Sequence, residues 1–162
     1  MTRTVLAAAL VVVLAASFAR GARADLEAGI NAYLDADYAM ALVELQPLAQ
    51  AGDTIAQFYL AEMHLHGRGV AQNFEDAAAW YAKAAESGHP EAQAALGSLQ
   101  MLGLGVPRYP SNAFFWLIFS VVWQDSDLRA AAMTSLGEVA AQLSPEQKRT
   151  IGGVAANQWR QQ

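Results

Sequence analysis

The chain repeats its pattern of apolar, small and polar residues every 36 positions. The repeated features are alanine–glutamine pairs, glycine pairs and single tryptophans, at the same spacing in both copies. The identical residues at matching positions are Gly52 and Gly88, Ala56-Gln57 and Ala92-Gln93, Leu60 and Leu96, Gly67, Gly69 and Val70 with Gly103, Gly105 and Val106, Ala77 and Ala113, and Trp80 and Trp116. A fixed period of about 20 to 50 residues indicates stacked structural units. The pattern therefore predicts a solenoid.

Each unit carries the start and stop signals of two helices. In the first unit, Asp53 or Thr54 can cap a helix that runs to about Leu65, and a loop with two glycines follows. Asn73 can cap the second helix, which we expect to end at Gly88. The second unit repeats these signals, so we predict an all-α fold of helix pairs.

Two further helices are predicted after the repeats. Asp125 or Ser126 can start a helix through Leu143. Residues 144–147 combine a capping serine, a proline at the first helical position and a glutamine three residues after the cap, so a final helix should start there and reach Trp159. Because the end of a solenoid needs an atypical element over its last apolar face, we interpret these helices as a C-terminal cap.

These signals divide the chain into five parts. They are a leader at 1–24, a degenerate opening repeat at 25–51, two well-formed repeats at 52–87 and 88–123, and the capping helices at 124–162.

The leader has the three-part plan of a secretory signal peptide. Arg3 provides a positive start, residues 5–18 are almost purely apolar, and Ala22 and Ala24 supply small residues for cleavage after Ala24. The alternative is an uncleaved membrane anchor, but an apolar run of about 14 residues is shorter than the roughly 20 that span a bilayer. We therefore expect a periplasmic or secreted protein with no membrane span after cleavage.

The net charge and the cysteine content exclude some classes of partner and some kinds of site. The whole chain has a net charge of −5, and the leader holds three of its arginines and no acid, which leaves seven Lys and Arg against 15 Asp and Glu. An acidic surface repels phosphate backbones, so no nucleic-acid partner is expected. The absence of cysteine excludes disulfides and thiolate zinc sites.

Residues 56–93 resemble the Sel1-like repeat, which is related to tetratricopeptide repeats. The resemblance lies in the motifs Ala-Gln, Gly-x-Gly-Val, Ala-x-x-Trp-Tyr-x-x-Ala-Ala and Gly-His-x-x-Ala-Gln, and it extends over about 26–123. It implies a right-handed α-solenoid that binds a protein or peptide on its concave face. By analogy with tetratricopeptide geometry, that face would be lined by Ile55, Phe58, Glu62 and His66 in the first repeat and by Glu91, Ala94, Ser98 and Leu102 in the second.

The second helix of the second repeat is unusually apolar. Phe119 and Val122 occupy the positions that Lys83 and Glu86 hold in the first repeat, and residues 114–123 are apolar except for one serine. Something must cover this surface. We expect the capping helices to do so, and the alternative is a partner or a homodimer through Phe115, Phe119 and Val122.

No catalytic or cofactor motif stands out. His64 and His66 are two positions apart, which on a helix directs their rings to different sides, so no metal site is expected. The loops at 67–69 and 103–105 lack the further Gly or Lys of a phosphate cradle. Neither a Gly-x-Ser-x-Gly elbow nor a Ser-x-x-Lys pair is present, and no cofactor is expected.

The function expected from these features is that of an exported scaffold or adaptor rather than an enzyme. Its groove, with an apolar floor and acidic edges, would suit a peptide or helix of basic character. Two alternatives remain: a cell-envelope enzyme or enzyme-regulatory subunit that acts on cell-wall material, and a structural homodimer through the helix at 114–123.

Overall fold

The computed structural model describes residues 25–123 and 126–160, so the leader and the predicted cap at Asp125 lie outside the described residues. A first helix covers 25–34. It is followed by α2 (Tyr38–Gln50), α3 (Thr54–His66), α4 (Phe74–Glu86), α5 (Pro90–Leu102), α6 (Pro110–Trp123), α7 (Ser126–Ala141) and α8 (Pro145–Trp159). The described residues form helices and no strands, which confirms the predicted all-α fold.

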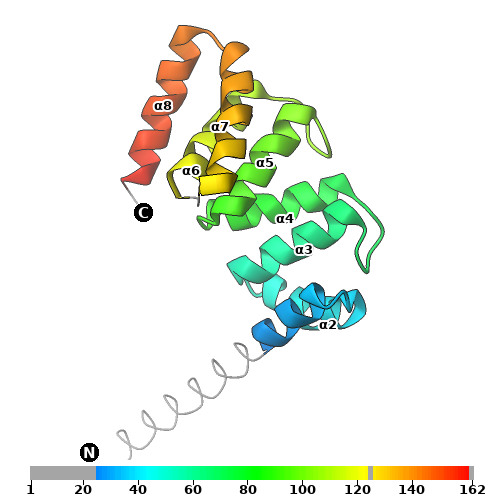
Figure 1. The fold of residues 1–162 in the computed structure, drawn as a ribbon. Helices are drawn as coiled ribbons and strands as arrows, with labels where there is room; N and C mark the ends of the chain where they lie inside the picture. Colours follow the sequence, from blue (N-terminus) through cyan, green and yellow to red (C-terminus); the bar gives the residue numbers. More distant parts are fainter. Residues whose placement is uncertain (1–24, 124–125, 161–162) are drawn as a thin grey trace, which may run out of the picture.

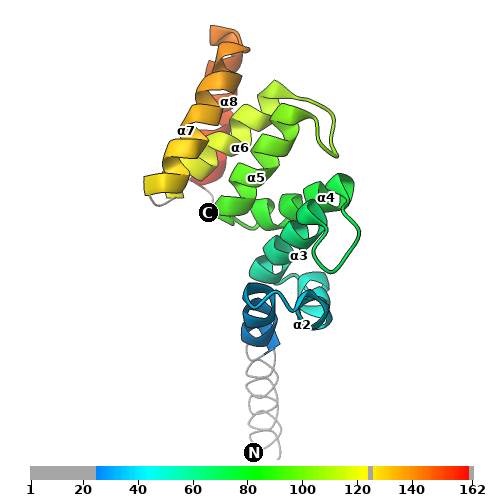
Figure 2. The same cartoon turned by 45° about the vertical axis from the view of Figure 1, so that its right-hand side comes forward.

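Successive helices stack along one direction. In Figure 1 and Figure 2, the helix pair 25–34/α2 lies at one end and α7 and α8 lie at the other, with α3 to α6 between them. The pairs α3/α4 and α5/α6 begin 36 positions apart, at Thr54 and Pro90. The sequence period is therefore the structural period of an α-solenoid.

Local capping fixes the helix starts. The Asp53 side chain accepts a hydrogen bond from the Ala56 backbone N–H at 2.8 Å, and Asn73 accepts from two N–H groups at the start of α4. In α8, Ser144 and Gln147 bond reciprocally, as their spacing predicts. At α7, the C-terminal end falls at Ala141, two residues before the predicted Leu143.

The loop inside each repeat approaches the preceding helix pair at its second glycine. Gly69 and Gly105 have positive φ angles of 71° and 68°. A Cβ atom on Gly69 would lie 2.8 Å from the Cβ of Tyr38, and one on Gly105 would overlap the backbone of Phe74. Both contacts are with the first residue of a second helix, so only glycine allows this approach.

Two buried glutamines join neighbouring pairs at equivalent positions. Gln57 and Gln93 are 6% and 1% exposed. Each donates a hydrogen bond of 3.2 Å from Nε2 to a backbone carbonyl near the end of the preceding helix, Ala49 for Gln57 and Ala85 for Gln93. A helix end leaves carbonyl groups without intrahelical partners, and the glutamines help to satisfy them.

The interior consists of clusters that follow the stack. The cluster of the opening pair and α3 includes Leu45 and Leu60, and the next includes Tyr81 and Leu96. Trp80 packs against both, so the repeated tryptophan joins adjacent units. Continuous burial from unit to unit replaces a single central core.

The apolar helix α6 is covered in part by the capping helices. Leu117, which is 1% exposed, packs in one cluster with Val139 of α7 and Leu143, and Ile151 of α8 packs against them. Phe119 is 4% exposed and therefore lies inside the protein. These contacts agree with the expected cover by the C-terminal helices.

The opening pair differs from the others in its connection. Three residues, 35–37, join its two helices, whereas seven residues join α3 to α4. Ala36 takes a positive φ of 62°, which closes the short turn without a glycine.

Within the described residues, no helix is long and apolar enough to cross a membrane.

We predict that Gly105→Ala lowers the free energy of unfolding by about 3 kcal/mol or more, because left-handed strain adds to overlap with the Phe74 backbone. The matched control is Gly88→Ala, where φ is 89° but nothing lies within 4 Å of a new Cβ, so only about 1–2 kcal/mol should be lost. Urea unfolding followed by circular dichroism measures both. Equal losses would show that the loop contact contributes nothing.

Candidate functional site

One face of α3 carries the four side chains that the sequence places on the binding surface. Ile55, Phe58, Glu62 and His66 are spaced by three or four residues, whereas the core-facing side chains of α3, such as Leu60, are buried. Ile55 is 41% exposed. The side chain of His66 is 46% exposed and that of Glu62 is 23% exposed. The face is therefore accessible at both ends and partly covered in its middle.

The corresponding face of α5 has smaller side chains at its middle. Ser98 and Ala94 are partly buried, and the Ser98 hydroxyl donates to the Ala94 carbonyl at 2.9 Å. Glu91 lies at the start of the helix, and Leu102, 60% exposed, lies at its end. The exposed apolar side chains of the two helices thus stand at opposite ends, Ile55 near the start of α3 and Leu102 at the end of α5.

Phe58 links the faces of the two helices. Its ring stacks on His89, with centroids 4.6 Å apart and planes inclined by 12°, and it meets Tyr59 edge-on at 5.5 Å. Phe58 also packs against the core cluster that contains Tyr81. It is therefore as much a packing residue as a surface residue, and its removal would disturb the junction with the next repeat.

Glu62 is held by a buried tyrosine. The Tyr81 hydroxyl donates a short hydrogen bond to Oε1 of Glu62, and Oε2 lies 3.5 Å from Nε2 of His66. Burial is the main cause that raises the pKa of Tyr81, and the hydrogen bond to the Glu62 carboxylate adds to it. Tyr81 therefore remains a neutral donor that fixes the carboxylate in place.

Arg68 binds the opening helix pair to the first repeat, a role that the sequence pattern did not reveal. Its Nη1 donates to the Tyr33 hydroxyl at 2.5 Å, and its guanidinium lies 5.5 Å from the centroid of the Tyr33 ring and 5.8 Å from that of Tyr38. Burial, the largest cause, raises the pKa of Tyr33, while the bond to Arg68 opposes that shift. In the sequence, Arg68 differs only in that the matching position of the second repeat holds a leucine, Leu104.

His89 caps α5, and its protonation state follows from its surroundings. Nδ1 lies 3.4 Å from the Ala92 backbone N–H donor and 3.1 Å from Oε2 of Glu91. Burial lowers the pKa of His89, and the nearby Glu91 carboxylate opposes that shift less strongly. Because a capping Nδ1 must be unprotonated to accept from Ala92, we assign a neutral ring with its proton on Nε2.

The other histidines have separate partners. Nδ1 of His64 lies 3.8 Å from Asp76, whereas His66 lies beside Glu62. In the part of the chain that the structure describes, no group of three His, Asp or Glu side chains could hold a metal ion.

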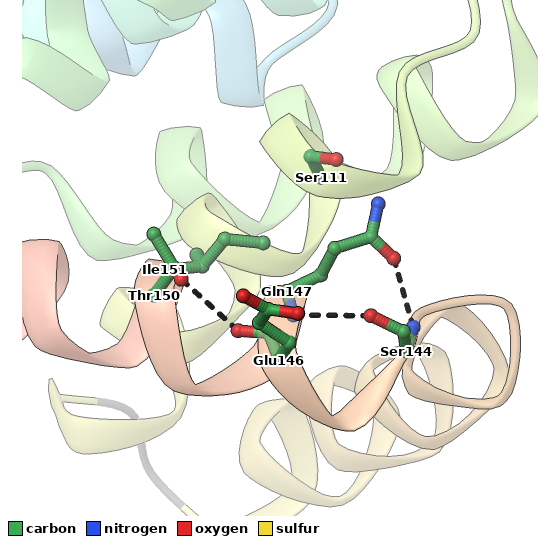
Figure 3. A pocket seen from close by; sticks show the side chains of 6 residues that line it. All are labelled: Ser111, Ser144, Glu146, Gln147, Thr150 and Ile151. Atoms are coloured by element: carbon green, nitrogen blue, oxygen red, sulfur yellow. Dashed lines mark hydrogen bonds between the residues drawn. The ribbon is translucent and has the colours of Figure 1, made fainter.

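A shallow pocket of about 310 Å³ lies between α6 and the start of α8 (Figure 3). Ser144 and Gln147 are engaged in the reciprocal cap, and the Thr150 hydroxyl donates to the Glu146 carbonyl. These side chains satisfy the helix backbone. The polar side chains of the pocket therefore stabilise the start of α8, and they form no arrangement typical of a catalytic site.

Of the candidate interface residues on α6, the structure buries Phe119 and leaves Phe115 partly buried. The two rings lie 5.0 Å apart, and Phe115 meets Trp116 edge-on at 5.1 Å. The side chain of Val122 lies outside the described part of the chain. Phe119 is therefore occupied by contacts of its own chain.

Comparisons with known proteins identify the repeats. The Sel1 repeat model matches residues 54–89 and 90–119. A protective antigen present in uropathogenic Escherichia coli strains, which displays an SLR fold, aligns with a TM-score of 0.71 and 27% identity over 83% of this chain. A Sel1 repeat protein from Oxalobacter formigenes aligns with a TM-score of 0.64 and 27% identity over 72%. The aligned parts cover only 29% and 46% of those two proteins, and no curated protein matches.

We predict that His89 makes stability depend on pH. Its pKa is lower in the folded state than the ordinary 6.5, so the unfolded chain binds more protons between those two values. The resulting loss of unfolding free energy should be absent above about pH 7 and should grow as the pH falls toward the folded pKa. His89→Asn keeps a capping side chain and removes the titration. Relative to this variant, the wild type should lose stability between about pH 7.5 and pH 5 in urea unfolding.

The matched control is His66→Asn, the same substitution at a histidine that lies at the C-terminal end of α3 and caps no helix start. A wild type and a His89→Asn variant that change in parallel with pH would contradict the assignment of a buried neutral ring.

Proposed function

We propose that this protein, which contains two Sel1 repeats, is an adaptor that binds a partner protein or peptide on the face formed by the first helices of its repeats, α3 and α5. The Sel1 repeat fold is generally a protein–protein interaction module. The observation that carries the proposal is the exposure of Ile55 and Leu102 at the two ends of this face, with Phe58 and Glu62 fixed between them. Exposed apolar side chains on a preorganised surface favour binding.

The rigidity of the face supports the proposal. Phe58 is held by His89, and Glu62 is held by Tyr81, each through a contact between neighbouring helices. A partner would therefore meet side chains that are already ordered and would not have to order them on binding. Less conformational entropy is lost in that case, which favours affinity for a small surface.

Export is part of the same proposal. The signal-peptide pattern of residues 1–24 motivates it, and the partner would then be a protein or peptide of the cell envelope or the exterior. Detection of a mature chain that begins at Asp25 in the periplasmic fraction would support this part. A full-length chain retained in the cytoplasm would contradict it without affecting the binding face.

We predict that the double variant Ile55→Ser/Leu102→Ser loses its partner in a crosslinking pull-down from the native cells, because the exposed apolar ends of the face are removed. The matched control is Met40→Ser/Val43→Ser on α2, where the side chains are 49% and 68% exposed. The control should retain the same partner, since it removes a similar exposed apolar area from another helix.

Thermal unfolding should show that both double variants remain folded, because all four side chains are well exposed. A partner lost from both variants, or from neither, would contradict binding on the α3/α5 face.

A further inference from the structure

We infer that the segment bound on the α3/α5 face is cationic, and that its Lys or Arg side chains pair with Glu62 and Glu91 beside the Phe58–His89 stack. This inference rests on the proposed function and adds the chemistry of the partner. It follows from the two carboxylates of this face, which form no ion pair with a Lys or Arg within 4.0 Å among the residues that the structure describes.

The layer formed by α3 and α5 carries acids and no Lys or Arg. Its two carboxylates are those of Glu62 and Glu91. A layer of one charge sign attracts ligands of the opposite sign and repels those of the same sign. The layer therefore selects against acidic partners before any specific contact forms.

Glu62 has no strong cation beside it. Among the described residues, its carboxylate is bonded to the Tyr81 hydroxyl and lies near the His66 imidazole. Arg68 interacts with Glu62 through its charge, but its guanidinium is directed at Tyr33, and among the described residues no ion pair within 4.0 Å joins the two. The Glu62 carboxylate is 23% exposed and can accept a closer cation at the middle of the face.

Glu91 is in the same condition at the start of α5. Its side chain is 43% exposed, and its Oε2 lies 3.1 Å from Nδ1 of His89, a mostly buried ring that is neutral and therefore supplies no positive charge. The other cations near the repeats have different contacts. Lys83 lies 3.7 Å from the centroid of the Trp80 ring, on the second helix of its repeat.

The stacked rings between these acids add a second recognition element. Phe58 lies one helical turn before Glu62, and His89 lies two residues before Glu91. A Lys or Arg side chain can lay its methylene groups along a ring face while its charged end meets a carboxylate. Two such acids beside one stack therefore fit basic side chains better than hydroxyl or amide side chains.

Other occupants fit these charges less well. A second copy of this chain would bring the same acidic layer against itself, and nucleic acids and anionic lipid surfaces would be repelled by it. An apolar segment without charge could use Ile55 and Leu102 but would leave both carboxylates unpaired. A basic amphipathic segment satisfies both features.

The test uses three synthetic peptides of about 15 residues with the same apolar positions, whose polar positions are all Lys, all Gln or all Glu. Binding to the purified protein is measured by fluorescence anisotropy. We expect the Lys peptide to bind most tightly, and its affinity to fall several-fold between about 50 mM and 500 mM NaCl because salt screens exposed charges. The variant Glu62→Gln/Glu91→Gln should weaken it by about 5- to 20-fold.

The matched control is Glu75→Gln/Glu86→Gln on α4, which changes the net charge by the same amount at two exposed positions outside the face. It should leave the affinity within about twofold. Equal weakening in both variants would show that only net charge matters and would overturn the inference. It would also be overturned if the Gln or Glu peptide bound as tightly as the Lys peptide, or if none of the three bound.

The pull-down separates this inference from the proposed function. If the captured partner depends on Ile55 and Leu102 but crosslinks through an acidic or uncharged segment, the binding face stands and the cationic partner is wrong. If no partner depends on these residues, while the Lys peptide still requires Glu62 and Glu91, the charge recognition stands and the proposed adaptor role is wrong.

Discussion

The stacking of this protein depends on the approach of one loop backbone to the start of the preceding second helix. Gly69 meets Tyr38 and Gly105 meets Phe74, at positive φ angles and at distances that leave no room for a Cβ atom. Gln57 binds a second point of the same junction through a carbonyl of the preceding helix. Two contacts per junction fix both the separation and the rotation of neighbouring pairs, because each acts at a different end of the unit.

Once the rotation is fixed, the first helices form one layer, and its side chains can act across repeats. Phe58 of α3 reaches His89 at the start of α5, and Tyr81 of α4 reaches Glu62. Phe58 and Glu62 therefore both stabilise the junction between repeats and form part of the binding face. A face built in this way is rigid, but its central side chains cannot be changed without cost to the junction. The outer positions, Ile55 and Leu102, are freer to specify a partner.

The protein distributes its charges unevenly between two kinds of contact. Arg68 and Lys83 lie against aromatic rings, where they stabilise the junction of the opening pair and the outer surface of α4. Glu62 and Glu91 are left with hydroxyl and imidazole neighbours. Because the cations are used in packing, the first-helix layer has a negative charge that a partner can neutralise. The packing of Arg68 and Lys83 against aromatic rings thus leads to the expectation of a cationic ligand.

The sequence alone determined the repeat and the helix starts, because caps and glycine turns act within a few residues. It showed that the apolar helix α6 must be covered, but the tertiary structure decided that α7 and α8 provide the cover. Asp53, Asn73 and Ser144 cap the helices that their local patterns predict. Contacts between distant residues needed the tertiary structure. Arg68 reaches Tyr33 across 35 positions, and the Tyr81 hydroxyl reaches Glu62 across 19, and neither pairing leaves a periodic signal. Stacking decides such contacts, since the rotation between neighbouring pairs sets which side chains meet.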